Sequence, residues 1–292
     1  MISIIIPAHN ESAVIKRTLQ RITAGAHPGE MEIIVVANGC SDATADVVRA
    51  FNHPNVCVIE TEIGSKTAAL NLGDAAANHF PRLYVDADVL LPIASVRAIS
   101  ARLMEEHVLA AGPSPSFDLT GCSWAVRAYY DINARLPSSR EGIGGSGVYG
   151  LSEKGRRRFS QFPDVTADDG FVRIQFHPEE RETLSDARSI VFAPKTLRDL
   201  IAIKTRSHFG SYELTRLYPD KWANKGQSNS GSLLRLWKNP LLWPRLMAYC
   251  GIKVVARQRA RNRFRAGGKQ WERDESSRQL LFPEPIGSDR GC

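Results

Sequence analysis

Four groups of polar residues interrupt the apolar runs in the first ninety residues of this 292-residue chain. The most specific group is Asp86-Ala87-Asp88, in which two carboxylates stand one residue apart. Such a pair can hold Mg²⁺ or Mn²⁺, and the oxygens of a bound anion can complete the shell of hard ligands. Lys66 is a candidate cation for such an anion. A solvated acidic turn and an exposed surface lysine are the alternative interpretations of these two features.

Each of the four groups follows a short apolar run rich in branched residues, at 2–6, 32–37, 56–59 and 83–85. Such runs are typical of strands buried on both faces, and residues 12–24, 41–51 and 66–78 have helical apolar spacing between them. The alternation predicts an α/β fold with a parallel sheet, whose ligands bind beyond the carboxyl ends of the strands. We therefore expect one site from Pro7-Ala8-His9-Asn10-Glu11, Asn38-Gly39-Cys40-Ser41-Asp42, Gly64-Ser65-Lys66 and Asp86-Ala87-Asp88.

A second set of candidates lies downstream. Residues 142–150 contain five glycines, which let the backbone approach a ligand closely, although a flexible loop before a strand has the same composition. Asp168 and Asp169 offer a carboxylate that can take the proton of an attacking hydroxyl; a helix N-cap is the alternative. The helical pattern at 195–214 carries Arg206 and His208, which are possible diphosphate contacts or members of a solvated helix face.

In this order the four groups resemble the nucleotide-binding half of family 2 glycosyltransferases, inverting enzymes of the GT-A fold, over about residues 1–210. The resemblance implies a Rossmann-like, mostly parallel sheet flanked by helices. It implies that Asp88 binds Mg²⁺ or Mn²⁺ directly and that Asp86 holds the sugar, the ribose or the metal through water. It makes Asp169 the general base and Asp168 a residue that orients the acceptor. The implied contacts to the nucleotide sugar are Pro7, Ala8, Asn10, Glu11, Asn38, Lys66 and Asp86, with Gly145, Ser146 and Gly147 beneath the donor sugar and acceptor.

The chain departs from the family pattern at three points. Asn38 stands where an aspartate usually accepts from the base, and an amide that both accepts and donates suits a pyrimidine, which favours UDP or dTDP sugars. Asp168 stands where glutamate is common, a side chain that is one methylene longer. The Q-x-x-R-W box of processive synthases is missing, which favours transfer of a single sugar.

The net charge of +7 is unevenly distributed. Residues 233–273 hold eleven Lys and Arg against the single acid Glu272, so this segment carries +10 and the rest of the chain carries −3. Trp243, Met247, Cys250 and Val254 recur there at helical steps, and Leu246 and Tyr249 widen the stripe. The pattern fits a helix lying on an anionic membrane through 239–265, or equally a helix docked on the catalytic domain; RNA binding is disfavoured.

The predicted organisation is a GT-A catalytic domain at 1–215, with a nucleotide-sugar half at 1–90 and an acceptor half at 91–215. A basic helical extension follows at 216–270, then a polar, partly disordered tail at 271–292. Five scattered cysteines without a C-x-x-C pair argue against disulfides and zinc, and neither a signal peptide nor a membrane span is expected. We expect a cytoplasmic protein, peripheral on the inner face of the cell membrane.

The sequence thus predicts a transferase that moves one sugar to an acceptor hydroxyl, with a lipid-linked glycan or polysaccharide intermediate as the candidate acceptor. A catalytically silent nucleotide-sugar-binding scaffold at a membrane is the alternative. A sugar nucleotidyltransferase should instead have a glycine-rich, arginine-containing loop after the first strand, where this chain has Pro7-Ala8-His9-Asn10-Glu11.

Overall fold

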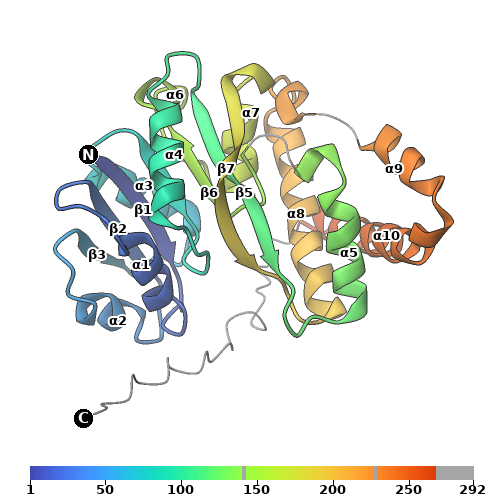
Figure 1. Ribbon diagram of the computed structural model, residues 1–292, viewed down its shortest axis with the longest axis horizontal. Helices are drawn as coiled ribbons and strands as arrows, with labels where there is room; N and C mark the ends of the chain where they lie inside the picture. The colour runs from blue at the N-terminus through green and yellow to red at the C-terminus, as the bar shows by residue number, and fades with distance from the viewer. Residues whose placement is uncertain (140–142, 227–228, 268–292) are drawn as a thin grey trace, which may run out of the picture.

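The computed structural model describes residues 1–139, 143–226 and 229–267. Within them, seven strands form one sheet in the order β3-β2-β1-β4-β6-β5-β7 (Figure 1). Every neighbouring pair is parallel except those of β6, which runs antiparallel to β4 and β5. The strands are β1 (Ile2–Ala8), β2 (Met31–Asn38), β3 (Val56–Thr61), β4 (Arg82–Val85), β5 (Ala110–Asp118), β6 (Val148–Leu151) and β7 (Arg181–Phe192).

Helices lie on both faces of the sheet, as the strand-helix alternation predicts. The helices are α1 (Ile15–Thr23), α2 (Thr44–Ala50), α3 (Lys66–Ala76), α4 (Ile93–Leu103), α5 (Trp124–Ala134), α6 (Glu153–Arg156), α7 (Asp168–Ile174), α8 (Leu197–Leu217), α9 (Ser230–Trp237) and α10 (Trp243–Arg265). Short 3-10 turns occupy Pro137–Ser139, Pro178–Glu180, Trp222–Lys225 and Pro240–Leu242. The α/β class with a mostly parallel sheet is therefore confirmed.

The core divides according to the alternation of side chains along β1. Ile4 and Ile6 pack toward α1 and α4 with Leu19 and Val96, whereas Ile5 packs on the opposite face with Leu70 of α3. All three isoleucines are fully buried, because both faces of the strand are covered. The prediction of burial on both faces is wrong for β3, which is the edge strand and leaves Cys57 and Glu60 exposed.

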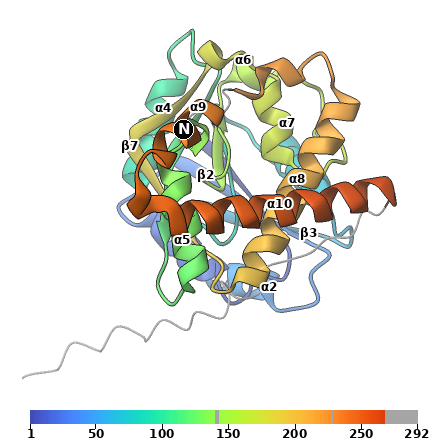
Figure 2. The same cartoon turned by 90° about the vertical axis from the view of Figure 1, so that its right-hand side faces the viewer.

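A third apolar cluster joins the C-terminal helices to the sheet domain. Leu246, Tyr249 and Ile252 of α10 pack with Tyr129 of α5 and Leu200 of α8, and the Tyr129 and Tyr249 rings stack with centroids 5.0 Å apart. Figure 2 shows α10 lying across α5 and α8. The helical extension is thus present and is part of the folded core.

The predicted tail at 271–292, the end of the predicted extension at 268–270 and Gly142 of the glycine-rich stretch lie outside the described residues. In the described part of the chain, no helix combines the length and the apolar character that crossing a bilayer requires.

Candidate active site

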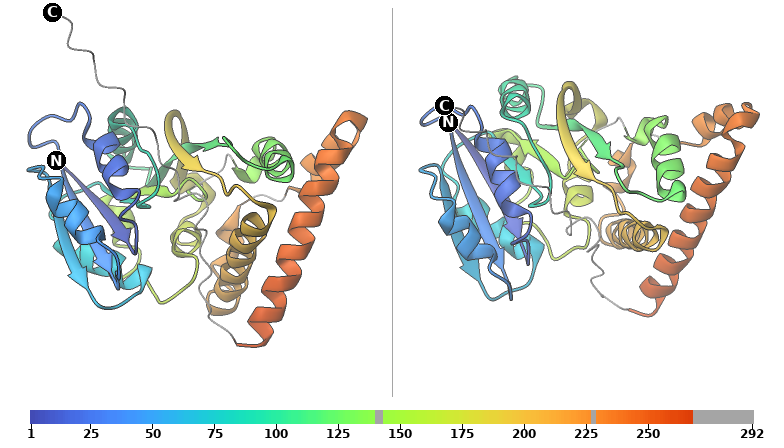
Figure 3. Two further views of the ribbon diagram at one scale, coloured as in Figure 1. Left: turned by 90° about the horizontal axis from the view of Figure 1, so that it is seen from below. Right: turned by 60° about the horizontal axis from the view of Figure 1, so that its bottom comes forward.

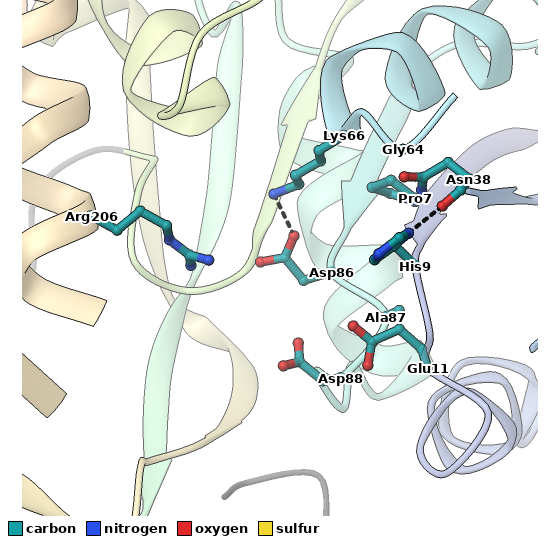
Figure 4. Close-up of a pocket in the computed structure, with 10 residues that line it drawn as sticks. All are labelled: Pro7, His9, Glu11, Asn38, Gly64, Lys66, Asp86, Ala87, Asp88 and Arg206. Atoms are coloured by element: carbon teal, nitrogen blue, oxygen red, sulfur yellow. Dashed lines mark hydrogen bonds and ion pairs between the residues drawn. The ribbon is translucent and has the colours of Figure 1, made fainter. Parts of the chain in front are cut away.

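A cavity of about 440 Å³ opens at the carboxyl ends of β1, β2 and β4 and reaches across to α8 (Figure 4). All four polar groups predicted from the sequence contribute residues to its wall. The lining residues are Pro7, His9, Glu11, Asn38, Gly64, Lys66, Asp86, Ala87, Asp88 and Arg206. The parallel sheet therefore brings together side chains that are up to 199 positions apart, from Pro7 to Arg206.

The loop after β1 is fixed by its contacts with the loop after β2. Asn10 adopts a left-handed backbone with φ 52°, and its Oδ1 accepts from the Ser41 amide at 2.7 Å. The Glu11 amide donates to Thr44 Oγ1 at 2.8 Å, while the Glu11 carboxylate lies at the pocket wall. Asn10 does not line the pocket, so its position supports a role in holding the loops together rather than the predicted contact with the nucleoside.

The nitrogen and the oxygen of the Asn38 side-chain amide have different surroundings. Its Nδ2 donates to the Ala8 carbonyl at 2.9 Å and to the Val36 carbonyl at 3.4 Å. Ala8 is itself fully buried and contributes this backbone oxygen rather than a pocket side chain. The His9 imidazole bonds through Nδ1 to the Asn38 backbone carbonyl. The amide donors of Asn38 are therefore used within the sheet edge, which leaves its Oδ1 as the atom for a ligand.

Lys66 begins α3 and links the two halves of the site. Its Nζ lies 2.7 Å from Asp86 Oδ1 and 3.0 Å from Asp168 Oδ1. Burial alone would lower the pKa of Lys66, but the Asp168 and Asp86 carboxylates outweigh it and raise this pKa above its ordinary value. Lys66 is thus a permanent cation at the pocket wall, and it holds the end of β4 against the start of α7.

The Asp86-Ala87-Asp88 segment rests on the glycine-rich loop. The Asp86 amide donates to the Gly147 carbonyl at 2.8 Å, and Gly147 has a φ of +66°. A Cβ on Gly147 would lie 2.5 Å from Val89 Cγ2 and 3.2 Å from Asp86 Oδ2, so only glycine fits beneath the carboxylate. Gly147 therefore sets the position of Asp86.

The neighbours of Gly147 have different roles. Ser146 is buried, and its hydroxyl donates to the Val148 carbonyl at 2.7 Å, which makes it part of the loop's own structure. The amide of Gly145 points at Asp169 Oδ2, 3.4 Å away. Gly145 itself has φ +74° and open space around its Cα. The glycine-rich loop therefore contacts Asp169 through a backbone amide.

Asp168 and Asp169 open α7, but their environments differ. Asp168 is buried, pairs with Lys66 and receives the Tyr149 hydroxyl at 3.4 Å. Burial raises the pKa of Asp168, against the Lys66 charge and with the help of the Asp169 and Asp86 charges. Asp169 is partly exposed and accepts from the Gly170 amide at 2.7 Å. The helix N-cap is Ala167, so the alternative in which these carboxylates are the cap does not hold.

Arg206 and His208 both lie on α8, but their side chains have different surroundings. Arg206 extends toward Asp86 from across the pocket (Figure 4). His208 is not among the residues that line the pocket, and its charged neighbours are Lys253 and Arg257 of α10 and Lys204. The placement of His208 argues against the predicted diphosphate contact, because helical residues two apart point in different directions.

Sequence reasoning missed three residues of the site. His9 and Gly64 were quoted within their motifs without a role, and both line the pocket. Gly64 lies so close to Gly39 that a Cβ on Gly39 would stand 2.7 Å from the Gly64 Cα. Arg17 of α1 lies near Asp88 and Glu11, and burial lowers its pKa despite these acids. No local spacing indicates Arg17, because Glu11 precedes α1 and six positions do not place two residues on one helix face.

The donor set at the pocket wall fits a hard divalent cation. Within the described residues no three His, Cys, Asp or Glu side chains gather into a complete metal site. Asp86 and Asp88 nevertheless offer two carboxylates beside the open cavity, where a diphosphate can add oxygens. Asp86 pairs with Lys66 through Oδ1, and the Asp88 carboxylate lies below Asp86 in the view of Figure 4, at the same pocket wall. These positions suit Asp88 as the direct ligand.

Comparisons with known proteins agree with this geometry. Residues 3–144 match the family described as Glycosyl transferase family 2. Over 94 residues the chain is 36% identical to the probable glycosyltransferase YdaM of Bacillus subtilis, covering 30% of this chain and 22% of that protein. The chain thus spans less than a quarter of the length of this curated relative.

Solved structures share the fold over more of the chain. The mannosyltransferase PcManGT of Pyrobaculum calidifontis, in complex with GDP-Man and Mn²⁺, aligns with a TM-score of 0.67 and 20% identity over 92% of this chain and 88% of that one. Glucosyl-3-phosphoglycerate synthase of Mycobacterium tuberculosis, with Mn²⁺, UDP and glucosyl-3-phosphoglycerate, aligns with a TM-score of 0.52 and 19% identity over 74% and 79%. The chain thus has the GT-A fold, and its residues 3–144 form a Glycosyl transferase family 2 domain.

Proposed function

We propose that the protein is an inverting, metal-dependent glycosyltransferase that moves one sugar from a nucleoside-diphosphate sugar to an acceptor hydroxyl. The observation that carries the proposal is the single cavity in which Asp86, Asp88, Lys66 and Arg206 meet Asn38. This cavity offers the Asn38 oxygen for a nucleotide base, and it offers the carboxylates of Asp86 and Asp88 beside the cations of Lys66 and Arg206. A sugar-phosphate bond that breaks there leaves negative charge beside groups already in place to stabilise it.

The donor nucleotide is recognised through Asn38. Because its amide hydrogens are donated to Ala8 and Val36, it faces the cavity as an acceptor. One acceptor matches the single ring N–H of uracil or thymine, whereas guanine presents two adjacent donors. This supports a UDP or dTDP sugar as donor, with Glu11 and Pro7 beside the nucleoside.

Asp88 binds the metal ion in this proposal, and Asp86 adds a carboxylate held by Lys66. Mg²⁺ or Mn²⁺, when bound, supplies Lewis-acid stabilisation of the departing diphosphate. Arg206, on the opposite wall, adds a cation from the chain itself. Lys66 keeps Asp86 in position and contributes its own positive charge.

Asp169 takes the proton of the acceptor hydroxyl. Of the two α7 carboxylates it is the one with partial exposure, since Asp168 is buried against Lys66 and Tyr149. The Gly145 amide directs the Asp169 carboxylate toward the glycine-rich loop, where the family places the sugar and acceptor. Asp168 acts as a positioning residue through Lys66, and it does not need to touch the acceptor.

The acceptor is a hydroxyl of a glycan, and we infer that it is carried on a lipid-linked or polysaccharide intermediate at the cytoplasmic face of a membrane. The basic extension through 239–265 supports that location. Single transfer fits a chain without the Q-x-x-R-W box. The alternative, a silent nucleotide-sugar-binding scaffold, shares the same pocket and differs only in turnover.

A thermal-shift screen of nucleoside diphosphates with and without Mn²⁺ tests the proposal. A ligand at about one hundred times its Kd stabilises the folded state by about 2.7 kcal/mol. We expect UDP or dTDP with Mn²⁺ to raise Tm in the unmodified chain but not in Asp88→Asn, with Asp186→Asn as the exposed-carboxylate control. Equal shifts without metal, or with Asp88→Asn, would refute the metal assignment.

A further inference from the structure

The first half of α10 leaves large apolar side chains exposed on the face that points away from the domain. Leu246, Tyr249 and Ile252 bury the inner face against α5 and α8. Met247 and Val254, from the stripe identified in the sequence, are 67% and 66% exposed. In Figure 3, α10 is the outermost element, with α8 between it and the sheet. The helix therefore docks through one face and leaves a second apolar face free.

The segment before α10 extends this face. The Trp237 and Trp243 rings stack with centroids 6.2 Å apart, and Trp243 Nε1 donates to the Trp237 carbonyl at 2.9 Å. Both rings are nearly half exposed. Soluble monomers seldom expose several large apolar side chains together, so the face has the character of a binding surface. We call it the outer patch; it comprises Trp237, Trp243, Met247 and Val254.

A cluster of four basic residues lines the seam between α8 and α10, beside the outer patch. Lys204 and His208 stand one turn apart on α8, and Lys253 and Arg257 stand one turn apart on α10. Arg257 stands three residues from Val254 on α10, so the cluster borders the patch there. Among the described residues none of the four forms a salt bridge with a carboxylate. We call these residues the seam cluster.

The members of the seam cluster disfavour one another's charge. Burial lowers the pKa of His208 to about 4, with further contributions from Lys253, Arg257 and Lys204. Burial also lowers the pKa of Lys253, again helped by Lys204 and Arg257. Lys204 and Lys253 lie over the rings of Tyr129 and Tyr249 at 5.3 and 5.5 Å, which holds them at the seam. An anion placed there would relieve the repulsion.

The positive charge of this region favours an anionic partner. From Ser230 to Arg265 the chain contains nine Lys and Arg and no Asp or Glu. In a symmetric dimer the same surface would face its own copy, so these bases would meet bases. An anionic bilayer supplies both an apolar layer for the tryptophans and phosphates for the cations.

We propose that the outer patch docks on a bilayer of anionic phospholipid, with Trp237 and Trp243 at the interface and the seam cluster binding a lipid phosphate. The inference rests on the proposed function only in so far as a lipid-linked acceptor requires a membrane. Docking on the membrane requires neither the sugar donor nor the acceptor. Docking can therefore fail while sugar transfer succeeds, and sugar transfer can fail while docking succeeds.

Co-sedimentation with vesicles tests the proposal, using phosphatidylcholine alone and phosphatidylcholine mixed with phosphatidylglycerol. Truncating the chain before α10 would remove Leu246 and Tyr249 from the core, so point variants are required. Met247→Glu/Val254→Glu changes only the exposed patch, and Met104→Glu, at a methionine 73% exposed on α4's end, is the matched control. Lys253→Gln/Arg257→Gln removes two seam charges, with Arg21→Gln as control.

The unmodified chain should bind the mixed vesicles and not phosphatidylcholine alone. Each basic residue near an anionic surface contributes about 1 kcal/mol, so the double seam variant should bind about 30-fold more weakly. The patch variant should lose binding, and both controls should keep it. Equal binding by the variants and the unmodified chain, or equal binding to both vesicle types, would overturn the proposal. A dimer in solution that Met247→Glu/Val254→Glu abolishes would overturn it in favour of a second copy.

Discussion

Replacing Lys66 with methionine tests whether this residue holds the two halves of the site together. The substitution keeps most of the side-chain volume but removes the cation that lies 2.7 Å from Asp86 Oδ1 and 3.0 Å from Asp168 Oδ1. The Asp168 side chain is only 7% exposed, whereas that of Asp86 is 38% exposed and more strongly screened by water. The loss therefore falls mainly on Asp168, which remains buried without its partner.

The two contacts differ in strength for that reason. A solvent-screened pair contributes up to about 1 kcal/mol, whereas removing one partner of a buried pair costs about 3–5 kcal/mol. We expect Lys66→Met to lower the free energy of unfolding at pH 7 by about 3 kcal/mol. Lys66→Met/Asp168→Asn should lose only about 1 kcal/mol, because the buried charge is removed with its partner.

The dependence on pH gives a second signature. Without Lys66 the pKa of Asp168 rises further, since the main opposing charge is gone. The folded state then binds more protons than the unfolded state above the ordinary pKa of aspartate, so stability increases as the pH falls from 7 toward 5. Urea unfolding followed by tryptophan fluorescence at both pH values measures this. A loss below about 1 kcal/mol that is the same at both pH values and in the double variant would refute the role assigned to Lys66.

Three further predictions follow from the same contacts. Gly147→Ala should lower the free energy of unfolding by at least about 2 kcal/mol in urea titrations, because it adds both backbone strain and a 2.5 Å contact with Val89; Gly251→Ala, in open space on α10, should not. Arg206→Gln should reduce kcat by about 10²-fold while leaving Tm unchanged, since its cation acts on the diphosphate; an unchanged kcat would remove Arg206 from the site. The imidazole of His208 should titrate with a pKa of about 4 by NMR, and because the unfolded state takes up this proton first, stability should fall as the pH drops from about 6.5 to 4. Lys253→Met should raise that pKa, and an unchanged value would contradict the seam cluster.

The nucleotide half of the fold could be predicted because its signals are local. Each βα unit shows a buried run, a polar group and a helical repeat within about thirty residues, and parallel pairing then forces the polar groups to one edge. The second half lacks this regularity. β6 inserts antiparallel between β4 and β5, and β5 pairs with β7 across an irregularity after Pro113, which no local pattern indicates.

The site was predicted by residue type better than by role. Asp86, Asp88, Lys66 and Asn38 do meet in one cavity. The pairing of Lys66 with Asp168 spans 102 positions and depends on the tertiary fold, which brings the first residues of α3 and α7 together and which spacing along the chain cannot reveal. Asn10 has a left-handed backbone, and its Oδ1 accepts from the Ser41 amide, a contact between two loops that the local sequence does not indicate.

The C-terminal helix illustrates the limit of periodicity. Trp243, Met247 and Val254 share one face and Leu246, Tyr249 and Ile252 share another, and both recur at helical spacing. Only the aromatic and aliphatic surface offered by α5 and α8 decides which face is buried. Docking on the domain therefore uses one face of the helix, and the membrane contact proposed above would use another.

The most direct test of the central claim is release of nucleotide from a donor that the chain binds, measured with a panel of glycan acceptors. We expect acceptor-dependent release in the unmodified chain and in Asp186→Asn. Asp169→Asn should lose about 10²–10⁴-fold in turnover while binding the donor equally well, because a general base acts on the proton and not on the nucleotide. Turnover that survives in Asp169→Asn would contradict the assignment of the base. Donor binding without turnover in the unmodified chain, across all donors and acceptors, would contradict the enzyme and favour the scaffold.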